Sequence, residues 1–306
     1  MKYFIITVDT EGDNLWNYKK GQQVKTENSL FIPRFQNLCE KYGFKPVWLT
    51  NYEMVSDQRY IDYIKPKMEA GKCEVGIHVH AWNNPPLYDL NAIYSGNPFL
   101  IEYPDEVMRE KFKTTYNLIK EKFGIEVKSH RAGRWVMDER YFDLLREFRI
   151  EADCSHTPGV SWAHVAGETI MGSDYTTVKN SPNYINGVLE IPMTIRASRI
   201  TKKGSIKHKL RVLLQGDNVW LRPATTSVED MLALCKRVDS EQYIDYLEFM
   251  IHSSELMPNG SPYFKDEKDI ENLYLSIERV FAYAKSIGYK GVTMNEYCRI
   301  YKKENK

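Results

Sequence analysis

The chain has 306 residues and a net charge of +1, with 42% hydrophobic and 27% charged residues. This composition is typical of a folded globular protein with a sizeable core, and the near-zero charge gives no general attraction to nucleic acid. No stretch of the sequence approaches the roughly 20 apolar residues that a membrane-spanning helix needs, so no transmembrane segment is expected.

Short apolar runs alternate with longer amphipathic runs along the chain. The apolar runs predict strands at Tyr3–Val8, Pro46–Thr50, Glu74–His78, Val127–Ser129, Glu151–Asp153, Val188–Ile191, Tyr246–Ile251 and Gly291–Thr293. The amphipathic runs predict helices at Ser29–Lys41, Arg59–Ala70, Pro104–Phe123, Glu139–Phe148, Ser227–Arg237, Asp269–Ser286 and Asn295–Lys303. Strands that alternate with helices imply a parallel sheet. About eight such repeats favour a closed or nearly closed α/β barrel, formed by one domain that spans residues 1–306.

One region, at about residues 196–222, interrupts this alternation. It is rich in lysine and arginine, its only acid is Asp217, and it contains the short apolar patch Leu210–Leu214. One interpretation is a solvated surface insertion between elements of the barrel. The other is a basic arm that binds an anionic partner, such as a phosphate-linked sugar or a lipid headgroup, and this arm would allow peripheral contact with a membrane.

The cysteines and the N-terminus indicate the cellular compartment. None of the five cysteines lies in a CxxC pair, and their odd number and wide spacing argue against a disulfide framework or a structural zinc site. The apolar run at the N-terminus is too short for the core of a signal peptide and is followed at once by acids. A cytoplasmic protein with reduced thiols is therefore expected.

Polar residues stand at the ends of several predicted strands. Asp9 and Glu11 follow the first strand, and their spacing of two points both carboxylates the same way if the strand continues. His78 and His80 end the third strand with the same spacing, as a pair of metal ligands requires. His252 ends a later apolar strand, and an imidazole can donate a proton near pH 7.

Arg131 and Asp153 also lie at or near the ends of predicted strands. The carboxyl ends of the strands form one face of a β/α barrel, so these residues can converge although they are far apart in the sequence. Taken singly, Asp9 could cap a turn and Arg131 could form a surface ion pair. Two imidazoles in register favour metal ligation, and the residue types together fit hydrolysis by a metal-activated water.

Four segments in this order resemble the motifs of a known family. The segments are Thr7–Glu11, Gly76–Trp82, His130–Trp135 and Ile251–Leu256. They resemble the polysaccharide deacetylases, carbohydrate esterase family 4, which contain the nodulation chitooligosaccharide deacetylase (NodB-like) homology domain. The resemblance runs from residue 3 to about residue 294 and is strongest to a branch found in lipopolysaccharide and surface-polysaccharide biosynthesis clusters. It implies a distorted (β/α)7-type barrel and a divalent metal ion, commonly zinc.

The resemblance also implies a role for each candidate residue. The roles are a catalytic base (Asp9), metal ligands (Glu11 and His78), an arginine that orients the base (Arg131), a later acid that supports the site (Asp153) and a general acid (His252). Three motifs depart from the usual pattern. Residues Arg131–Trp135 replace a motif that usually contains a tyrosine or phenylalanine. Thr10 separates two acids that are usually adjacent, and Trp82 stands where the second metal histidine is usual. His80 is therefore expected to act as the second histidine ligand, and Asp9 is a further candidate ligand.

These residues lead to one main hypothesis of function and two alternatives. The main hypothesis is a metal-dependent hydrolase that removes an N-acyl group, expected to be acetyl, from an amino sugar of a surface polysaccharide or its precursor. The first alternative is a deformylase or another C–N hydrolase that acts on a lipid-phosphate-linked sugar or a ureide. The second is a carbohydrate-binding pseudoenzyme. Each of them predicts a carbohydrate or sugar-linked partner, with a phosphate group in the case of the lipid-linked substrate.

Overall fold

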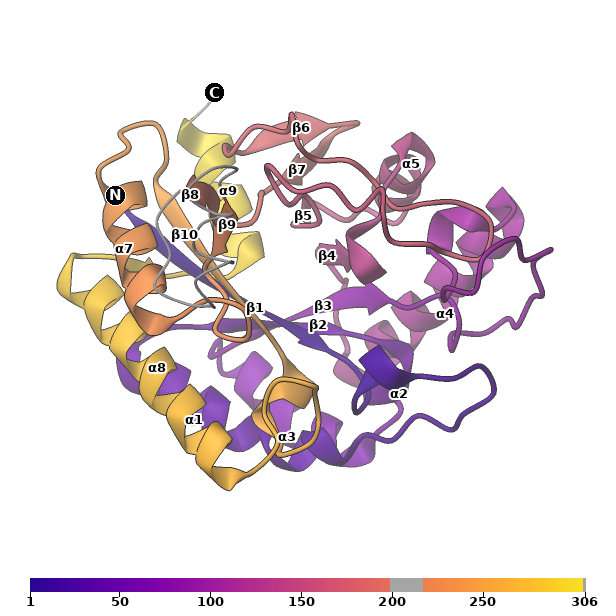
Figure 1. Ribbon diagram of the computed structural model, residues 1–306, viewed down its shortest axis with the longest axis horizontal. Coiled ribbons are helices and arrows are strands. Elements are labelled where there is room, and N and C mark those ends of the chain that lie inside the picture. The colour runs from indigo at the N-terminus through magenta and orange to yellow at the C-terminus, as the bar shows by residue number, and fades with distance from the viewer. Residues whose placement is uncertain (199–216, 305–306) are drawn as a thin grey trace.

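The computed structural model describes residues 1–198 and 217–304. A curved, mostly parallel sheet forms the centre of the molecule, and helices cover its outer side (Figure 1). The strands of this sheet follow the order β10-β1-β2-β3-β4-β5-β7-β6, and β11 pairs with β1. Neighbouring strands are parallel except for β6 and β7. This curled sheet with flanking helices confirms the predicted distorted (β/α) barrel.

The observed elements follow the predicted ones closely. The strands are β1 (Tyr3–Thr10), β2 (Pro46–Thr50), β3 (Glu74–Val79), β4 (Ser129–Ala132), β5 (Ala152–Asp153), β6 (Asn183–Ile185), β7 (Val188–Glu190), β8 (Ile195–Ser198), β9 (Asp217–Trp220), β10 (Tyr246–His252) and β11 (Lys290–Gly291). The helices are α1 (Ile32–Tyr42), α2 (Tyr52–Val55), α3 (Gln58–Glu69), α4 (Asp105–Phe123), α5 (Glu139–Glu147), α7 (Val228–Asp239), α8 (Glu267–Ser286) and α9 (Met294–Glu304). Each predicted strand and helix overlaps one of these, whereas the short elements α2, β6, β8 and β9 were not predicted.

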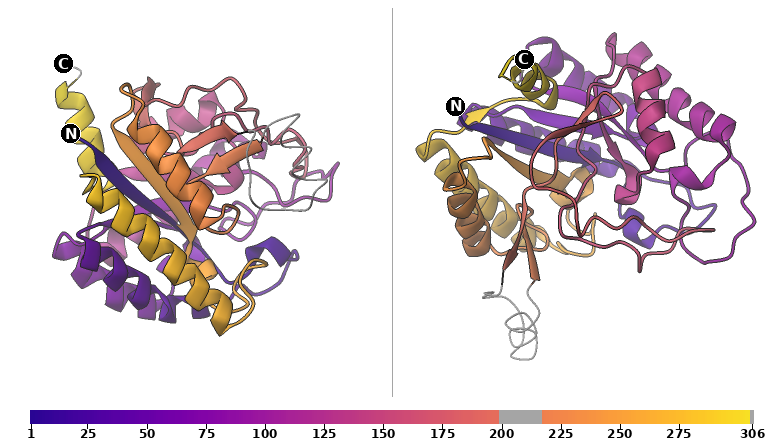
Figure 2. Two further views of the ribbon diagram at one scale, coloured as in Figure 1. Left: turned by 60° about the vertical axis from the view of Figure 1, so that its left-hand side comes forward. Right: turned by 90° about the horizontal axis from the view of Figure 1, so that it is seen from above.

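The central strands are buried on both faces. All eight residues of β1 are buried, as expected where helices cover one side of a sheet and the barrel interior fills the other. Figure 2 shows β1 and β10 side by side, with α7 and α8 along them. Phe281 of α8 packs edge-on against Phe4 of β1 and Phe249 of β10, at ring distances of 5.6 and 5.3 Å. These contacts fix the two strands that carry much of the candidate site.

The side of the barrel between β7 and β10 is closed without a strand pair among the described residues. Instead, the chain that follows β7 runs along β10. The backbone N–H of Glu248 donates to Oγ1 of Thr194 at 2.8 Å, and the N–H of Met250 donates to the carbonyl oxygen of Leu221 at 3.2 Å. This irregular closure is the distortion of the barrel.

The strand register brings residues from distant parts of the chain to one edge of the sheet. Asp9 of β1 lies opposite His252 of β10. His78 of β3 lies opposite Arg131 of β4. Because the strands are parallel, their carboxyl ends meet at the same edge, which is where active sites form in β/α barrels.

Most of the predicted basic insertion, residues 199–216, lies outside the described residues. The parts that flank it form β8 and β9, which pair with each other in antiparallel fashion. Within β8, Arg196 is buried and forms an ion pair with Glu241 at 2.6 Å. The five cysteines are free and buried. Among the helices of the described residues, none has both the length and the apolar character needed to cross a membrane.

Candidate metal centre and catalytic residues

Glu11, His78 and His80 form a compact buried group at the carboxyl ends of β1 and β3. Their candidate ligand atoms all lie within 4.8 Å of one another. Nε2 of His80 is 2.6 Å from Oε2 of Glu11 and 3.1 Å from Nε2 of His78. The structure therefore brings together the three residues that the sequence predicts as metal ligands.

The hydrogen bonds of His78 leave one of its ring nitrogens available for a cation. Its Nδ1 lies 2.8 Å from the carbonyl oxygen of Arg131, and a carbonyl only accepts, so Nδ1 carries the proton. In the neutral ring Nε2 then has a free lone pair, which faces His80 and Glu11. Two imidazole nitrogens and one carboxylate are a common donor set for zinc, and a carbonyl bonded to the far ring nitrogen is typical of such ligands. The residues fit a divalent ion.

The charges of the group also favour a cation. Burial raises the pKa of Glu11, but His252 and His80 lower it more, so the pKa lies well below its usual range. Burial lowers the pKa of His80 below its usual value although Glu11 acts in the other direction. For His78 burial again lowers the pKa, but Asp9 and Glu11 raise it more. An ionised glutamate and a neutral His80 are the ligating forms of these residues, and the carboxylates attract positive charge to this place.

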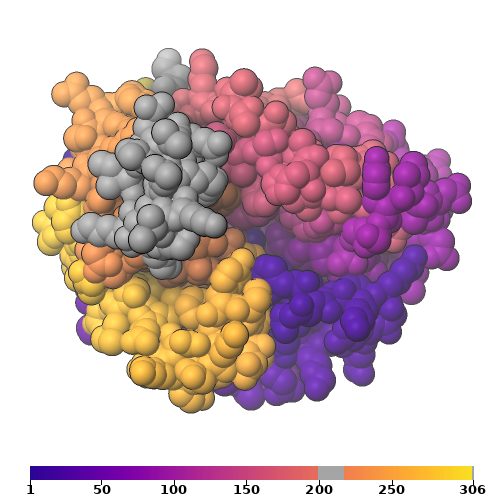
Figure 3. All heavy atoms as spheres, viewed as in Figure 1, coloured from indigo at the N-terminus to yellow at the C-terminus, as the bar shows by residue number. Residues whose placement is uncertain are grey.

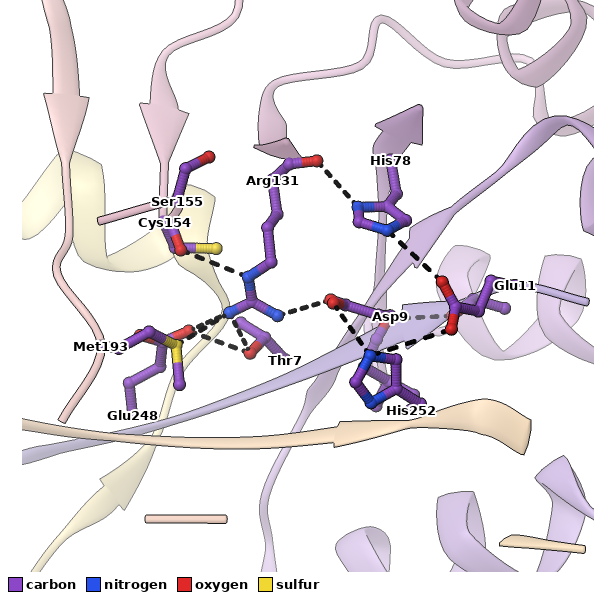
Figure 4. Close-up of polar contacts among 12 residues, drawn as sticks. Thr7, Asp9, Glu11, His78, Arg131, Cys154, Ser155, Met193, Glu248 and His252 are labelled. Atoms are coloured by element: carbon purple, nitrogen blue, oxygen red, sulfur yellow. Dashed lines mark hydrogen bonds and ion pairs between the residues drawn. The ribbon is translucent and has the colours of Figure 1, made fainter. Parts of the chain in front are cut away.

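Arg131 is buried beside this group and contacts two carboxylates, as Figure 4 shows. Its Nη1 donates to Oδ1 of Asp9 at 2.5 Å, and its Nη2 donates to Oε1 of Glu248 at 2.5 Å and to Oγ1 of Thr7 at 2.7 Å. Its Nε donates to the carbonyl oxygen of Cys154 at 3.2 Å. These contacts engage all three nitrogens of the guanidinium and therefore fix its orientation.

Asp9 is held in the ionised form by this arrangement. Burial raises the pKa of its carboxyl, but the charges of Arg131, His78 and His252 lower it more, and the pKa lies below its usual value. Arg131 occupies only Oδ1, so Oδ2 remains directed towards His252, whose Nε2 lies 3.7 Å away. Asp9 thus presents a charged oxygen next to the candidate metal ligands.

His252 has a different partner for each of its protonation states. Its Nε2 faces Asp9 and Glu11, at 3.7 and 3.8 Å. On the other side, Nδ1 lies 3.1 Å from Nη2 of Arg222 and 3.4 Å from Oε1 of Glu255. An arginine only donates, so its contact suits an unprotonated Nδ1, whereas the carboxylate suits the imidazolium. The ring is therefore supported whether or not it carries the second proton.

Glu255 is itself ionised in this environment. Burial raises the pKa of its carboxyl, but Arg222 and His252 lower it more, to about 2. Its Oε2 also accepts a hydrogen bond from the backbone N–H of His252 at 3.0 Å. The carboxylate that faces Nδ1 of His252 is thus held in place by the backbone N–H of His252 itself.

Asp153 does not lie with the other candidate residues. It pairs in register with His130, whose Nδ1 is 2.6 Å from its Oδ1. Because side chains alternate along a strand, this pair points to the opposite face from Arg131. Its link to the site is indirect: Ser155 donates to Asp153 and accepts from the N–H of Ala132, both at 2.8 Å. Asp153 is thus linked to the candidate site through Ser155, and its role as a supporting acid stays a prediction.

Three residues near the site were not identified from the sequence: Glu248, Arg222 and Glu255. Glu248 lies within the apolar strand β10. The feature of the sequence that could have identified it is a single acid in an otherwise apolar, buried strand. Arg222 stands at the end of the region interpreted as a basic insertion, where no single arginine was distinguishable. Glu255 belongs to the Ile251–Leu256 segment, but the spacing alone did not show that it folds back onto His252.

The chain matches no protein-family model and no curated protein in sequence. Solved structures do resemble it. A proposed polysaccharide deacetylase from Mycobacterium smegmatis aligns over 99% of this chain and 92% of its own, with a TM-score of 0.54 and 13% identity. A 4-alpha-glucanotransferase from Thermococcus litoralis aligns over 98% of this chain but 38% of its own, with a TM-score of 0.50 and 11% identity. A family 4 acetyl xylan esterase from Clostridium thermocellum, in complex with a cobalt ion, aligns over 98% and 91%, with a TM-score of 0.49 and 13% identity.

At these identities the likeness establishes the fold. The chain shares its distorted barrel with the proposed polysaccharide deacetylase from Mycobacterium smegmatis, and this is the fold that its motifs predicted. The position of the candidate metal group at the carboxyl edge of that barrel comes from the geometry of this chain itself.

Proposed function

We propose that the protein is a divalent-metal-dependent hydrolase that removes an N-acyl group, acetyl in the first place, from an amino sugar of a surface polysaccharide or its precursor. The observation that carries this proposal is that the candidate acid and base, His252 and Asp9, lie at the same edge of the barrel as the candidate metal ligands. His252 lies within 3.8 Å of both Asp9 and Glu11, and Glu11 belongs to the candidate metal group. The shared fold with polysaccharide deacetylases supports it.

Glu11, His78 and His80 are the residues that would hold the ion. A bound divalent ion such as zinc lowers the pKa of a water molecule and polarises the acyl carbonyl. Asp9 then accepts the proton of the attacking water on Oδ2, the oxygen that Arg131 leaves free. Arg131 acts on this step by keeping Asp9 ionised and oriented, since its guanidinium is fixed by its other contacts.

His252 completes the reaction as the acid. Its Nε2 is on the same side as Asp9, so a protonated ring can deliver that proton to the departing amine. Glu255 stabilises the imidazolium through Nδ1. Breaking the C–N bond leaves a carboxylic acid and a free amino sugar. Asp153 takes no part in proton transfer in this scheme, and it supports the end of β4 through Ser155.

The test is hydrolysis of N-acetylated oligosaccharides by the zinc-loaded protein, measured as acetate and free amine released. Asp9→Asn and His252→Ala should each lower kcat by roughly 10²- to 10⁴-fold, the usual contribution of a positioned acid or base. Glu278→Gln is the control, because Glu278 pairs with Lys41 on the surface away from the site. Unchanged activity in both site variants would exclude the proposed roles.

A carbohydrate-binding protein without turnover is the second candidate. Trp82 stands where the family usually has a metal histidine, and its ring lies 4.2 Å from the ring of His80. Failure to bind any divalent metal after reconstitution, with glycan binding intact, would support this candidate. Assays with N-formylated and phosphate-linked sugars separate the acetyl hydrolase from other C–N hydrolases. We also propose a cytoplasmic location, which the five free, buried cysteines support.

A further inference from the structure

Two of the three candidate metal ligands lie just beyond the ends of their strands. β1 ends at Thr10 and β3 ends at Val79, so Glu11 and His80 each follow the last residue of a strand. The ladder of hydrogen bonds between strands ends before them. Because a metal ion needs its ligand atoms at defined positions, contacts outside the sheet have to fix these two residues.

The turn that follows β2 supplies one such contact to His80. β2 lies between β1 and β3 in the sheet, and Asn51 is the residue directly after it. The backbone N–H of Asn51 donates to the carbonyl oxygen of Thr10 at 2.9 Å, and Oδ1 of Asn51 accepts from the N–H of His80 at 3.3 Å. This buried residue thus continues the link between β1 and β3 past the end of the sheet.

Glu53, in α2, connects the two segments that carry the ligands. Its Oε1 accepts from the backbone N–H of Gly12 at 2.7 Å and from Nδ2 of Asn51 at 3.2 Å. Its Oε2 accepts from Nδ2 of Asn83 at 2.9 Å. In Figure 3 the first part of the chain, coloured indigo, and the segments that follow β3, coloured purple, lie on one side of the central hollow of this face. One carboxyl group therefore holds the loop after β1 to the loop after β3.

The backbone of Glu11 itself has contacts of a different kind. Its N–H donates to Oγ of Ser253 at 3.2 Å, and its carbonyl oxygen accepts from Nδ2 of Asn28 at 2.9 Å. These contacts fix Glu11 relative to the turn after β10 and to the segment before α1. Glu53 instead fixes the neighbouring Gly12 relative to the chain that follows β3, the strand before His80. Its contacts therefore bear on the separation between the carboxylate ligand and the imidazole ligands.

We propose that Asn51 and Glu53 are positioning residues of the metal centre, which set the separation between Glu11 and His80. The pair replaces the strand ladder at the point where the ladder ends. This inference rests on the proposed function, because it takes Glu11, His78 and His80 as the metal ligands. It adds the part of the chain that holds these ligands ready for the ion.

The test measures the Kd of zinc by competition with a chromophoric chelator. Glu53→Ala should raise this Kd by about ten- to hundredfold, the usual cost of removing a group that orients metal ligands. Glu53→Gln should stay within about threefold of the wild type, because its amide oxygen can still accept from Gly12 and Asn51. Its NH2 group then faces Asn83, whose Oδ1 makes no hydrogen bond in the described structure and can turn to accept one.

The matched control is Glu40→Ala. Glu40 is also partly buried, and it accepts hydrogen bonds from Gln36 and Lys67 at 3.0 and 2.7 Å. It lies near the end of α1, where the chain turns into β2 at the opposite edge of the sheet. Urea unfolding of the metal-free variants separates a loss of zinc affinity from a general loss of stability. A Kd for Glu53→Ala equal to that of the control, or equal losses in Glu53→Ala and Glu53→Gln, would overturn the inference.

Two further measurements cover the cases in which a variant does not fold or the wild type binds no zinc. If Glu53→Ala does not fold, Asn83→Ala removes one of the contacts and should raise the Kd by about threefold or more, whereas a Kd equal to that of the control would reject the role. If the wild type binds no zinc, the proposed function fails, and amide hydrogen exchange of the metal-free protein tests the positioning role. The Gly12 amide should exchange about five- to tenfold faster in Glu53→Ala than in Glu40→Ala, because it loses its acceptor, and equal rates would reject the role.

Discussion

Arg131 and Glu248 face each other inside the barrel, with Nη2 of the arginine 2.5 Å from Oε1 of the glutamate and neither side chain exposed. The same guanidinium binds Asp9, so one buried cation is shared by two carboxylates. Burial raises the pKa of a carboxyl, and for Asp9 the charges of the close arginine and of His78 and His252 together lower the pKa more than burial raises it. The Arg131–Glu248 contact thus holds in place the group that keeps Asp9 ionised.

Arg131→Met should destabilise the protein strongly. The change leaves Asp9 and Glu248 buried without their common cation, and breaking a buried ion pair by removing one partner costs about 3–5 kcal/mol. Urea unfolding at pH 8 measures the loss. Arg279→Met is the control, since Arg279 pairs with Glu229 at 3.1 Å on the surface and such pairs are worth about 1 kcal/mol or less. Equal losses in the two variants would contradict the role assigned to Arg131.

Glu248 should make stability depend on pH. Burial raises the pKa of its carboxyl to about 7, although Arg131 and Thr7 lower it. An unfolded glutamate has a pKa of about 4.3, so between these values the folded protein binds a proton that the unfolded chain does not. The stability that this proton contributes is complete below about pH 4 and is lost as the pH rises to about 7.

The comparison that isolates this effect is between wild type and Glu248→Gln, whose side chain does not titrate. The stability of the wild type relative to the variant should fall by up to about 3 kcal/mol between pH 4 and 7 and stay constant above that. Chemical unfolding at several pH values measures the difference. A difference that does not change with pH would show that Glu248 has an ordinary pKa in the folded protein.

Divalent metal should bind to the folded protein and stabilise it through Glu11, His78 and His80. Glu11→Gln, His78→Ala and His80→Ala should each lower the zinc content measured by elemental analysis, and a chelator should lower the melting temperature of the wild type but not of these variants. Zinc at 100 times its Kd would add about 2.7 kcal/mol of stability. His164→Ala changes an exposed histidine and serves as the control. Full zinc content in all three site variants would show that the metal binds elsewhere in the protein.

Glu255→Gln should lower kcat while it leaves KM nearly unchanged. The amide keeps an oxygen for the N–H of His252 but loses the negative charge that stabilises the imidazolium. We expect a loss of about tenfold, equivalent to about 1.4 kcal/mol. Glu110→Gln, on the exposed face of α4, is the matched control in the same assay of amine release. A kcat equal to that of the control would mean that Glu255 only shapes the turn after His252.

Most of the elements could be predicted because their patterns are local. The apolar run at Tyr3–Val8 and the amphipathic run at Asp269–Ser286 depend on neighbouring residues alone, and β1 and α8 lie where they were expected. Element ends were less accurate. The fourth strand was predicted at Val127–Ser129, whereas β4 covers Ser129–Ala132 and so includes Arg131 within the strand.

The candidate metal group was predictable for the same reason, whereas the direction in which the side chain of Asp153 points was not. Because side chains alternate along a strand, a spacing of two residues places His78 and His80 on the same side of it, independently of the rest of the fold. The direction of Asp153 depends on how β5 pairs with β4, and that pairing places it beside His130 on the far face. Glu248 could not be recognised as part of the site because its partner, Arg131, is distant in sequence.

By itself, the sequence determined which residues stand at strand ends and which of them share a side, because side-chain alternation is a local property of the chain. Only the tertiary structure decided which of these residues meet. The pairing of β1 with β10 places Asp9 beside His252, and the fold of the turn after β10 returns Glu255 to the same imidazole. The physical reason is that strand pairing and burial depend on contacts between residues far apart in the chain, which no local pattern encodes.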